Sequence, residues 1–186
     1  PSGNFGNLTA GLIAQKMGLP IHHFIAATNA NDVVPEYLVS GEFTPRPSIA
    51  TISNAMDVGN PSNFVRMLDI FGSTWNTMQQ HVSGYAFDDN ATRKAIKAVK
   101  KKFDYIIDPH GAVGYLALKV YQKNHQRSVG VILETAHPSK FIDVVEREIA
   151  SEVAIPERLA ILANKEKQSV NMPVDFAIFK EWLLNI

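Results

Sequence analysis

The segment Pro1–Asn7, with the sequence PSGNFGN, has the residue types of a loop that binds a phosphate group. Gly3 and Gly6 allow the backbone to approach a ligand closely and to adopt positive φ angles. Asn4 and Asn7 tolerate similar backbone geometry and offer amide side chains. The segment leads directly into a predicted helix, whose free N–H groups and positive dipole end favour an anion. A tight turn before a helix explains these residues equally well when they are considered alone.

The ligand of such a loop is expected to be a single small phosphate. The sequence contains no G-x-G-x-x-G pattern of the kind that binds dinucleotides. No Lys-Ser or Lys-Thr pair follows the loop to serve a nucleoside triphosphate and its magnesium ion. Backbone N–H groups around one phosphate are therefore the better interpretation.

A second candidate site is the segment ETAHPSKF, residues 134–141. Thr135 stands at the end of an apolar stretch predicted as a strand, where an α/β sheet presents ligand-contacting groups. Its hydroxyl group could form a hydrogen bond with a ring nitrogen. The alternative is that Thr135 caps a helix beginning near Pro138, because proline suits an early helical position. The residues alone do not decide between these interpretations.

Two further polar, glycine-bearing segments follow predicted strands, at residues 53–66 and 108–115. Asn54, Asp57 and His110 could face a substrate from these segments, although such residues are more often turn or cap residues. The six histidines show no metal-ligand spacing, so we expect no metal site.

The elements that would position these residues alternate between strands and helices. Helical spacing, caps and stop signals predict helices over residues 8–17, 33–43, 64–72, 89–103, 112–123 and 175–184. Apolar or β-branched runs predict strands over residues 21–28, 48–53, 103–108 and 128–135. Such alternation is typical of an α/β fold with a mostly parallel sheet flanked by helices.

The composition excludes several classes of function. Lys+Arg and Asp+Glu both number 18, so the formal net charge is zero. This balance argues against binding to nucleic acid or to a membrane surface, because both attract basic proteins. No apolar run approaches the roughly 18 residues of a membrane-spanning helix. Cysteine is absent, which excludes disulfides and thiol nucleophiles. We expect a cytoplasmic protein.

Five motifs, in one order along the chain, resemble those of threonine synthases from bacteria and fungi. They are PSGNFGNLTAGL, FIAATNANDVVPEYL, ATISNAMDVGNPSN, DPHGAVGYLAL and TAHPSKF. The similarity continues to the C-terminal MPVDFAIFKEWLL and so covers essentially the whole chain. It implies the large-domain portion of a fold-type II pyridoxal-phosphate enzyme. Residues 1–150 would form a partial pyridoxal-phosphate-binding α/β domain, and residues 151–186 a C-terminal helical segment packed on it.

The resemblance implies a reaction in threonine biosynthesis. Threonine synthases convert O-phospho-L-homoserine and water into L-threonine and phosphate, and they are pyridoxal-phosphate-dependent carbon–oxygen lyases acting on phosphates. Two alternatives stay open at this point. One is another fold-type II pyridoxal-phosphate lyase or synthase. The other is a non-catalytic phosphate-binding module.

The resemblance also implies roles for individual residues. The cofactor phosphate would be held by the backbone of Gly3, Asn4, Phe5, Gly6 and Asn7. Thr135 would meet the pyridine nitrogen, where a neutral hydroxyl does not force that nitrogen to be protonated. Glu134, just before it, stands where many relatives carry a small residue such as serine or glycine.

No catalytic residue is assigned in this chain. The Schiff-base lysine of the family lies in an F-K-D-type motif well upstream of the phosphate loop. Lys16, Lys119 and Lys140 do not follow that motif. We therefore expect the chain to be a fragment that is inactive alone, with the N-terminal part of the same enzyme as its partner.

Overall fold

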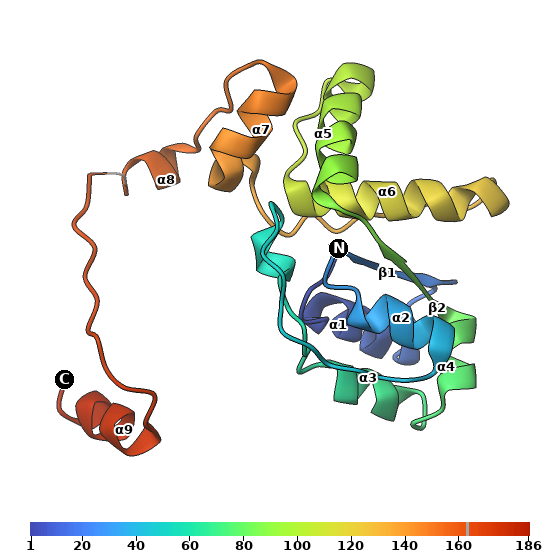
Figure 1. The fold of residues 1–186 in the computed structure, drawn as a ribbon, viewed down its shortest axis with the longest axis horizontal. Coiled ribbons are helices and arrows are strands. Elements are labelled where there is room, and N and C mark those ends of the chain that lie inside the picture. Colours follow the sequence, from blue (N-terminus) through green and yellow to red (C-terminus); the bar gives the residue numbers. More distant parts are fainter. Residues whose placement is uncertain (163) are drawn as a thin grey trace. The chain divides into compact units, whose positions relative to one another are not determined.

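The structure is a computed structural model that describes residues 1–162 and 164–186. The chain forms two compact units, Pro1–Val153 and Ala154–Ile186 (Figure 1). The first unit contains, in order, α1 (Gly6–Lys16), β1 (Phe24–Thr28), α2 (Val33–Ser40), the 3₁₀ helix η1 (Asn54–Met56), α3 (Phe64–Ile70), α4 (Trp75–His81), β2 (Val82–Ala86), α5 (Asp89–Phe103), α6 (Pro109–Asn124), the 3₁₀ helix η2 (Pro138–Phe141) and α7 (Ile142–Ile149). The second unit contains α8 (Glu157–Ala160) and α9 (Phe176–Leu184).

The sheet of the first unit is a parallel pair, β1 and β2, in register from Phe24 opposite Val82 to Thr28 opposite Ala86. Successive strand residues face opposite sides of a sheet. Accordingly, Ala26 packs in the core formed with α1 to α4, whereas Ala27 packs against Val113 and Ala117 of α6. Helices therefore cover both faces of the pair (Figure 1). The α/β fold with a parallel sheet and flanking helices is confirmed.

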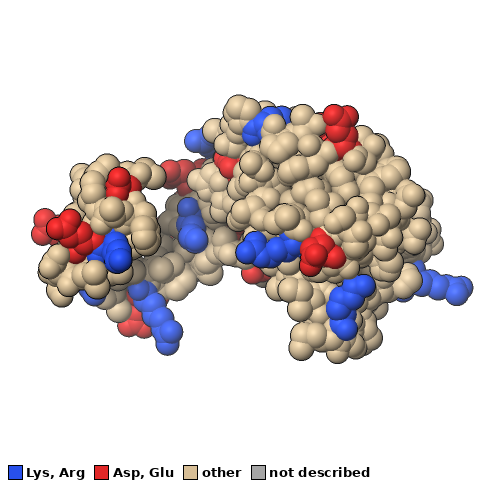
Figure 2. Space-filling model, turned by 90° about the horizontal axis from the view of Figure 1, so that it is seen from below, with Lys and Arg blue, Asp and Glu red and all other residues tan. Residues whose placement is uncertain are grey.

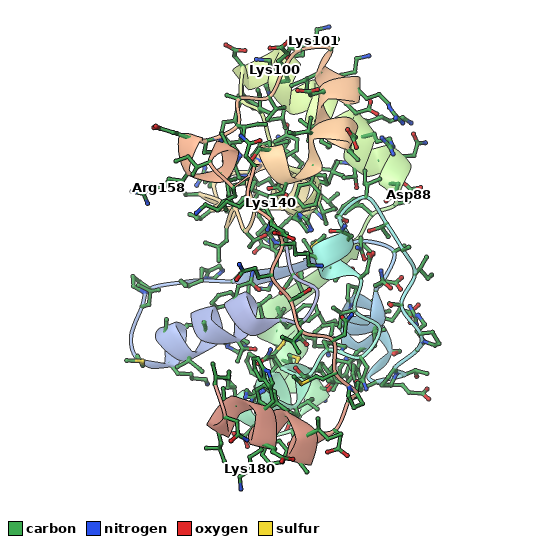
Figure 3. The ribbon with its side chains drawn as sticks, turned by 90° about the vertical axis from the view of Figure 1, so that its left-hand side faces the viewer. Asp88, Lys100, Lys101, Lys140, Arg158 and Lys180 are labelled. Atoms are coloured by element: carbon green, nitrogen blue, oxygen red, sulfur yellow. The ribbon has the colours of Figure 1, made fainter. Side chains whose placement is uncertain are left out.

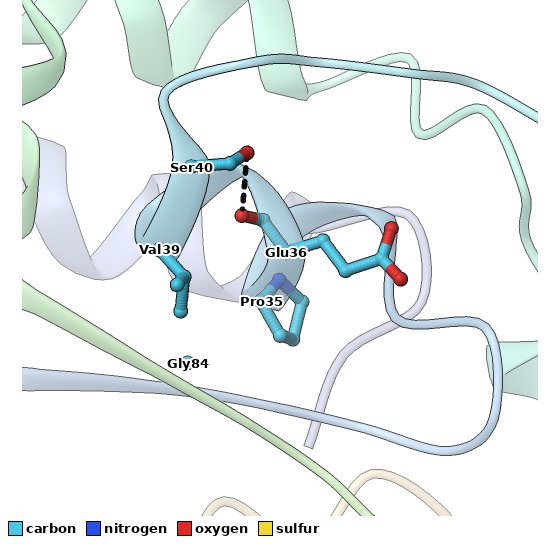
Figure 4. A pocket seen from close by; sticks show the side chains of 5 residues that line it. All are labelled: Pro35, Glu36, Val39, Ser40 and Gly84. Carbon is cyan, nitrogen blue, oxygen red and sulfur yellow. Dashed lines mark hydrogen bonds between the residues drawn. The ribbon is translucent and has the colours of Figure 1, made fainter.

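Gly84 in the middle of β2 allows α2 to pack closely on the strand. A Cβ at this residue would lie 2.6 Å from the Cα of Pro35, so no side chain fits. A shallow pocket at this contact is lined by Pro35, Glu36, Val39, Ser40 and Gly84 (Figure 4). The Ser40 hydroxyl donates 2.9 Å to the carbonyl oxygen of Glu36 in its own helix. None of the predicted cofactor-binding residues lines this pocket.

Helix α5 has the charge distribution that the sequence indicates. Asp88 caps its N-terminus by accepting a 2.7 Å hydrogen bond from the N–H of Ala91. Lys100 and Lys101 lie in its last turn, at the other end of the helix (Figure 3). These charges complement the helix dipole. On the face seen in Figure 2, acidic and basic residues are interspersed among other residues rather than segregated by sign.

Three segments that were predicted as strands, residues 48–53, 103–108 and 128–135, do not form strands in the structure. Residues 48–53 form a loop leading into η1, and residues 105–108 form a short connection before α6. Residues 128–135 pair with no strand in the part of the chain that the structure describes. Conversely, β2 was not expected from the sequence, because it is short and carries Gly84 in its interior.

Segment 128–135 nevertheless has the alternation of a strand. Added Cβ atoms at Gly130 and at Gly114 of α6 would overlap the side chains of Leu118 and Ile132, respectively, so these residues lie against one another. The intervening apolar side chains of this segment point away from α6 and are 94%, 81% and 54% exposed at Val129, Val131 and Leu133. The segment is therefore extended, with one side on α6 and the other uncovered. It lacks only the neighbouring strand that a ladder requires.

The second unit is helical in its last segment, as predicted. Asp175 caps α9 by accepting hydrogen bonds of 2.8 and 3.1 Å from the N–H groups of Ala177 and Ile178. The packing of residues 151–186 on the larger domain stays a prediction. Among the described residues, no helix is both long and apolar enough to cross a membrane.

The packing of α3 provides a test of the core. Met67 is completely buried, whereas Val65 in the same helix is 65% exposed. We expect Met67→Ala to lower the free energy of unfolding by about 2–5 kcal/mol, because it leaves a cavity in the core. Val65→Ala should change it by less than about 0.5 kcal/mol. Urea unfolding followed by circular dichroism measures both, and equal losses would contradict the packing of this helix.

Candidate functional site

The loop Pro1–Asn7 lies at the carboxyl end of β1. The N–H of Ser2 donates to the carbonyl oxygen of Ala27 over 2.9 Å, next to the last residue of the strand. Ligands of parallel α/β sheets bind beyond this end of the strands. The loop then enters α1 at Gly6. The prediction that the loop leads directly into a helix is therefore confirmed, and the structure places it at the end of a strand.

The backbone of the loop turns at Phe5 rather than at a glycine. Phe5 has a φ of 59° and precedes the first residue of α1, whereas Gly3 and Gly6 do not have positive φ angles. The prediction of positive φ at these two glycines is therefore wrong. A left-handed conformation costs a non-glycine residue free energy, and here the ring of Phe5, 2% exposed in the main core, holds it in place.

Gly3 is required for close approach of two backbones. A Cβ at this position would lie 2.5 Å from the Cα of Met56 and 3.0 Å from its carbonyl carbon. At Gly6 an added Cβ would meet only the amide nitrogen of Asn63, at 3.6 Å, which is an ordinary contact. The floor of the loop is therefore the backbone of η1.

The amide side chains of the loop hold its shape. The Oδ1 of Asn4 accepts a 2.6 Å hydrogen bond from the N–H of Ser62, and its Nδ2 donates 2.9 Å to the Ser62 hydroxyl. The Nδ2 of Asn7 donates 2.8 Å to the carbonyl oxygen of Pro1, and its Oδ1 accepts from Ser2 and Leu8. Ser62 therefore bonds to the loop and does not cap α3.

The backbone N–H groups from Gly3 to Asn7 have no acceptor among the described residues. Five consecutive donors lie at the N-terminus of an α-helix of 11 residues. Unpaired N–H groups together with the positive end of the helix dipole form an anion-binding site. The left-handed residue within the run is typical of the concave N–H arrangements that bind phosphate. The donors of the loop therefore fit a phosphate group, while Gly3 allows the loop to rest on η1.

Thr135 is exposed and does not cap a helix. The cap of η2 is His137, whose Nδ1 accepts a 3.1 Å hydrogen bond from the N–H of Ser139. The alternative interpretation of Thr135 as a helix cap is therefore wrong. The preceding residue, Glu134, faces α6: its carboxyl oxygens occupy the space that a Cβ at Gly111 would need.

Glu134 lies beside the buried carboxyl group of Asp108. Removal from water and the negative charge of Asp108 raise the pKa of Glu134 to about 7. Burial, the largest single cause, would raise the pKa of Asp108 as well, but the hydrogen bonds from His110 and the smaller interactions with its neighbours together lower it. The environment therefore pushes the two pKa values in opposite directions, so that Glu134 holds a proton to higher pH than Asp108 does.

Of the other sequence candidates, His110 bonds to η1, and Asp57 holds the shape of a neighbouring loop. The Nε2 of His110 is 3.2 Å from the backbone N of Ala55 in η1. Asp57 accepts hydrogen bonds of 2.8 and 2.7 Å from Asn29 and the Thr51 hydroxyl, within a polar network that closes the loop after β1. The side chain of Asn54 is exposed and forms no recorded hydrogen bond among the described residues.

Sequence reasoning missed the residues on which the phosphate loop rests. Met56 contributes backbone atoms, so its side-chain type carries no signal of this contact. Ser62 contacts a residue 58 positions away, which no local pattern reveals. Asp108 lies in a polar segment that the sequence indicated as a turn, and in the structure it caps the start of α6. Their shared feature is proximity in space to the loop, which the separations along the chain conceal.

Comparisons with known proteins agree on one family. The family model described as "Threonine synthase, C-terminal" matches residues 111–182. Threonine synthase from Haemophilus influenzae is 44% identical over 99% of this chain and 42% of its own length. That from Escherichia coli is 41% identical over the whole chain and 42% of its own length. The chain thus spans about two fifths of the length of these relatives.

Solved structures give the same result. The structure of threonine synthase from Escherichia coli matches all of this chain and 42% of its own chain, with a TM-score of 0.87 at 40% identity. A PLP-bound threonine synthase from Brucella melitensis matches all of this chain and 45% of its own chain, with a TM-score of 0.82 at 29% identity. Over its whole length, the chain therefore matches the C-terminal part of threonine synthases in sequence and in fold.

The carboxyl pair predicts a pH dependence of stability. The pKa of Glu134 is about 7 in the folded protein, above its value of roughly 4.3 in an unfolded chain. Folding thus favours the protonated form, and this contribution is present at low pH and lost as the pH rises through about 7. We expect wild type to lose stability relative to Glu134→Gln between about pH 5 and pH 8. Urea unfolding across this range measures the difference, and an equal effect of replacing the exposed Glu42 by glutamine would contradict it.

Proposed function

Since the chain matches the C-terminal part of threonine synthases, we propose that it supplies the phosphate-binding part of a pyridoxal-phosphate site in such an enzyme. The parent enzyme converts O-phospho-L-homoserine and water into L-threonine and phosphate, as a carbon–oxygen lyase acting on phosphates. The observation that carries the proposal is the run of unpaired N–H groups from Gly3 to Asn7 at the N-terminus of α1.

The loop is suited to hold the phosphate of the cofactor without rearrangement. Its N–H groups donate hydrogen bonds to phosphate oxygens, and the dipole of α1 favours the negative charge. The contact of Gly3 with Met56 and the bonds of Asn4 to Ser62 fix the loop before a ligand arrives. Such preorganisation lowers the entropy lost on binding.

Thr135 is suited to meet the pyridine nitrogen with its hydroxyl group, which can donate or accept a hydrogen bond. Successive residues of an extended segment face opposite sides. Because the carboxyl group of Glu134 lies against Gly111 of α6, the side chain of Thr135 points away from α6. This arrangement keeps the acid of Glu134 on α6 and leaves a neutral group for the ring.

The remaining contributions come from outside these motifs. When bound, pyridoxal phosphate acts as an electron sink for the substrate. The covalent lysine of the family is expected in an F-K-D-type motif, which Lys16, Lys119 and Lys140 do not follow. Because the chain covers 42% of its relatives' length, we infer that the lysine and further substrate contacts belong to the rest of such an enzyme. We place that enzyme in the cytoplasm.

Substitution of Gly3 tests the phosphate loop. Gly3→Ala is expected to weaken pyridoxal-phosphate binding about tenfold or more, because the added methyl group displaces the loop from Met56 and misaligns donors worth roughly 1.5–3 kcal/mol each. Gly6→Ala should cause a smaller loss, since its methyl group meets only the Asn63 amide. Titration with the cofactor in the polypeptide that carries this chain measures both. Equal affinities for wild type and Gly3→Ala would refute the proposed site.

Activity measurements test whether the site is divided between this chain and the rest of such an enzyme. We expect the 186-residue chain alone to release no phosphate from O-phospho-L-homoserine, because it lacks the lysine motif. Joining it to the remaining length of its parent enzyme should give phosphate and L-threonine, and L-serine should be a poor substitute. Turnover by the chain alone, abolished by replacing one of its own lysines, would show that the division is incorrect.

A further inference from the structure

His110 is a buried histidine whose ring is bonded on two sides. It is 1% exposed and is the second residue of α6. Its backbone N–H and its Nδ1 lie 2.8 and 2.7 Å from the Oδ1 of Asp108. Across the ring, Nε2 lies 3.2 Å from the backbone N of Ala55. A backbone N–H can only donate, so Nε2 accepts and the ring carries its proton on Nδ1.

The hydrogen bond between His110 and Ala55 is connected to the loop Pro1–Asn7 through the next residue, Met56. Ala55 and Met56 are consecutive residues of η1, and Met56 is the residue on which the backbone of Gly3 rests. A shift of η1 would therefore move the floor of the loop. An apolar residue could fill the same space, but it would leave the Ala55 N–H without this acceptor and remove the bond that holds η1 to α6.

The face of the ring contacts the other predicted cofactor segment. The rings of His110 and Phe141 have centroids 4.9 Å apart and an interplanar angle of 56°. Phe141 is the last residue of η2, which follows Thr135 in the motif TAHPSKF. One side chain therefore contacts both the element beneath the phosphate loop and the element next to Thr135.

We propose that His110 is a positioning residue that fixes η1 beneath the phosphate loop and η2 beside the Thr135 segment, as a neutral ring with its proton on Nδ1. The inference rests on the proposed function of the loop as the cofactor-phosphate site. His110 acts through Ala55, Met56 and Phe141. Asp108 sets the tautomer, because its Oδ1 accepts hydrogen bonds from the backbone N–H and from Nδ1–H of His110.

Two substitutions separate the two sides of the ring. His110→Gln can place Oε1 near the position of Nε2 and retain an acceptor for the Ala55 N–H. His110→Asn retains a donor for Asp108 but is too short to reach Ala55. A third variant, Val99→Ala, removes buried atoms from α5 without changing a hydrogen bond of the ring and controls for loss of stability.

The experiment uses the polypeptide that carries this chain, with pyridoxal phosphate as the ligand. We expect His110→Asn to weaken its affinity about fivefold to tenfold, the effect of one lost hydrogen bond. His110→Gln and Val99→Ala should stay within about threefold of wild type. Nitrogen-15 NMR of wild type should show Nδ1 protonated and Nε2 unprotonated. The Ala55 amide should resist hydrogen exchange in wild type and His110→Gln, but not in His110→Asn.

Other results would overturn the inference. A proton on Nε2, or equal losses of cofactor affinity in His110→Asn and Val99→Ala at equal stability, would remove the positioning role. Failure of the proposed function looks different. If wild type binds no pyridoxal phosphate but shows the Nδ1 tautomer and the protected Ala55 amide, the loop is not a cofactor site. The support of η1 by His110 would then still be established.

Discussion

The contact between the backbones of Gly3 and Met56 is the constraint on which the arrangement of the site depends. Residue 3 is a glycine, and this allows the backbone of the loop to approach the backbone of η1 closely. In this position the five N–H groups from Gly3 to Asn7 have no acceptor among the described residues. The hydrogen bond from Ser2 to Ala27 then ties the loop to the end of β1. Segments more than 50 residues apart along the chain thus meet at the carboxyl end of one strand, with Asn4 bonded to Ser62. Displacing η1 would disturb the donors of the loop before any ligand is bound.

Local sequence signals predicted those elements that depend only on their own residues and not on a neighbour in space. Glycines indicate the loop before α1, and β-branched residues indicate the strand within residues 21–28. Asp88 and the lysines of the last turn indicate the two ends of α5. Strand pairing depends on a neighbour, and residues 128–135 have strand alternation without a partner among the described residues. The left-handed turn at Phe5 depends on a core pocket for its ring, which no local pattern reveals. The five motifs indicated the family, but not the supporting roles of Met56 and Ser62.

Helix α6 connects the two ends of the proposed site because its first turns are built from small residues. Gly111 admits the carboxyl group of Glu134, and Gly114 admits Pro1 and Ile132. On another side, Val113 and Ala117 pack toward β1. The start of the phosphate loop and the segment before Thr135 therefore lie on the same helix. This arrangement gives a physical reason for the glycines of the DPHGAVGY motif: a larger side chain at either position would push one of the two segments away.

The uncovered side of residues 129–133 has a consequence for how this polypeptide must be produced. Val129, Val131 and Leu133 project from an extended backbone whose hydrogen-bonding groups meet no neighbouring strand in the described part of the chain. An exposed apolar edge of this kind is a template for strand addition and aggregation between molecules. A strand added alongside this segment would cover the edge and pair its backbone groups. Residues 128–135, which the sequence predicts as a strand, can therefore promote aggregation for as long as this edge stays uncovered.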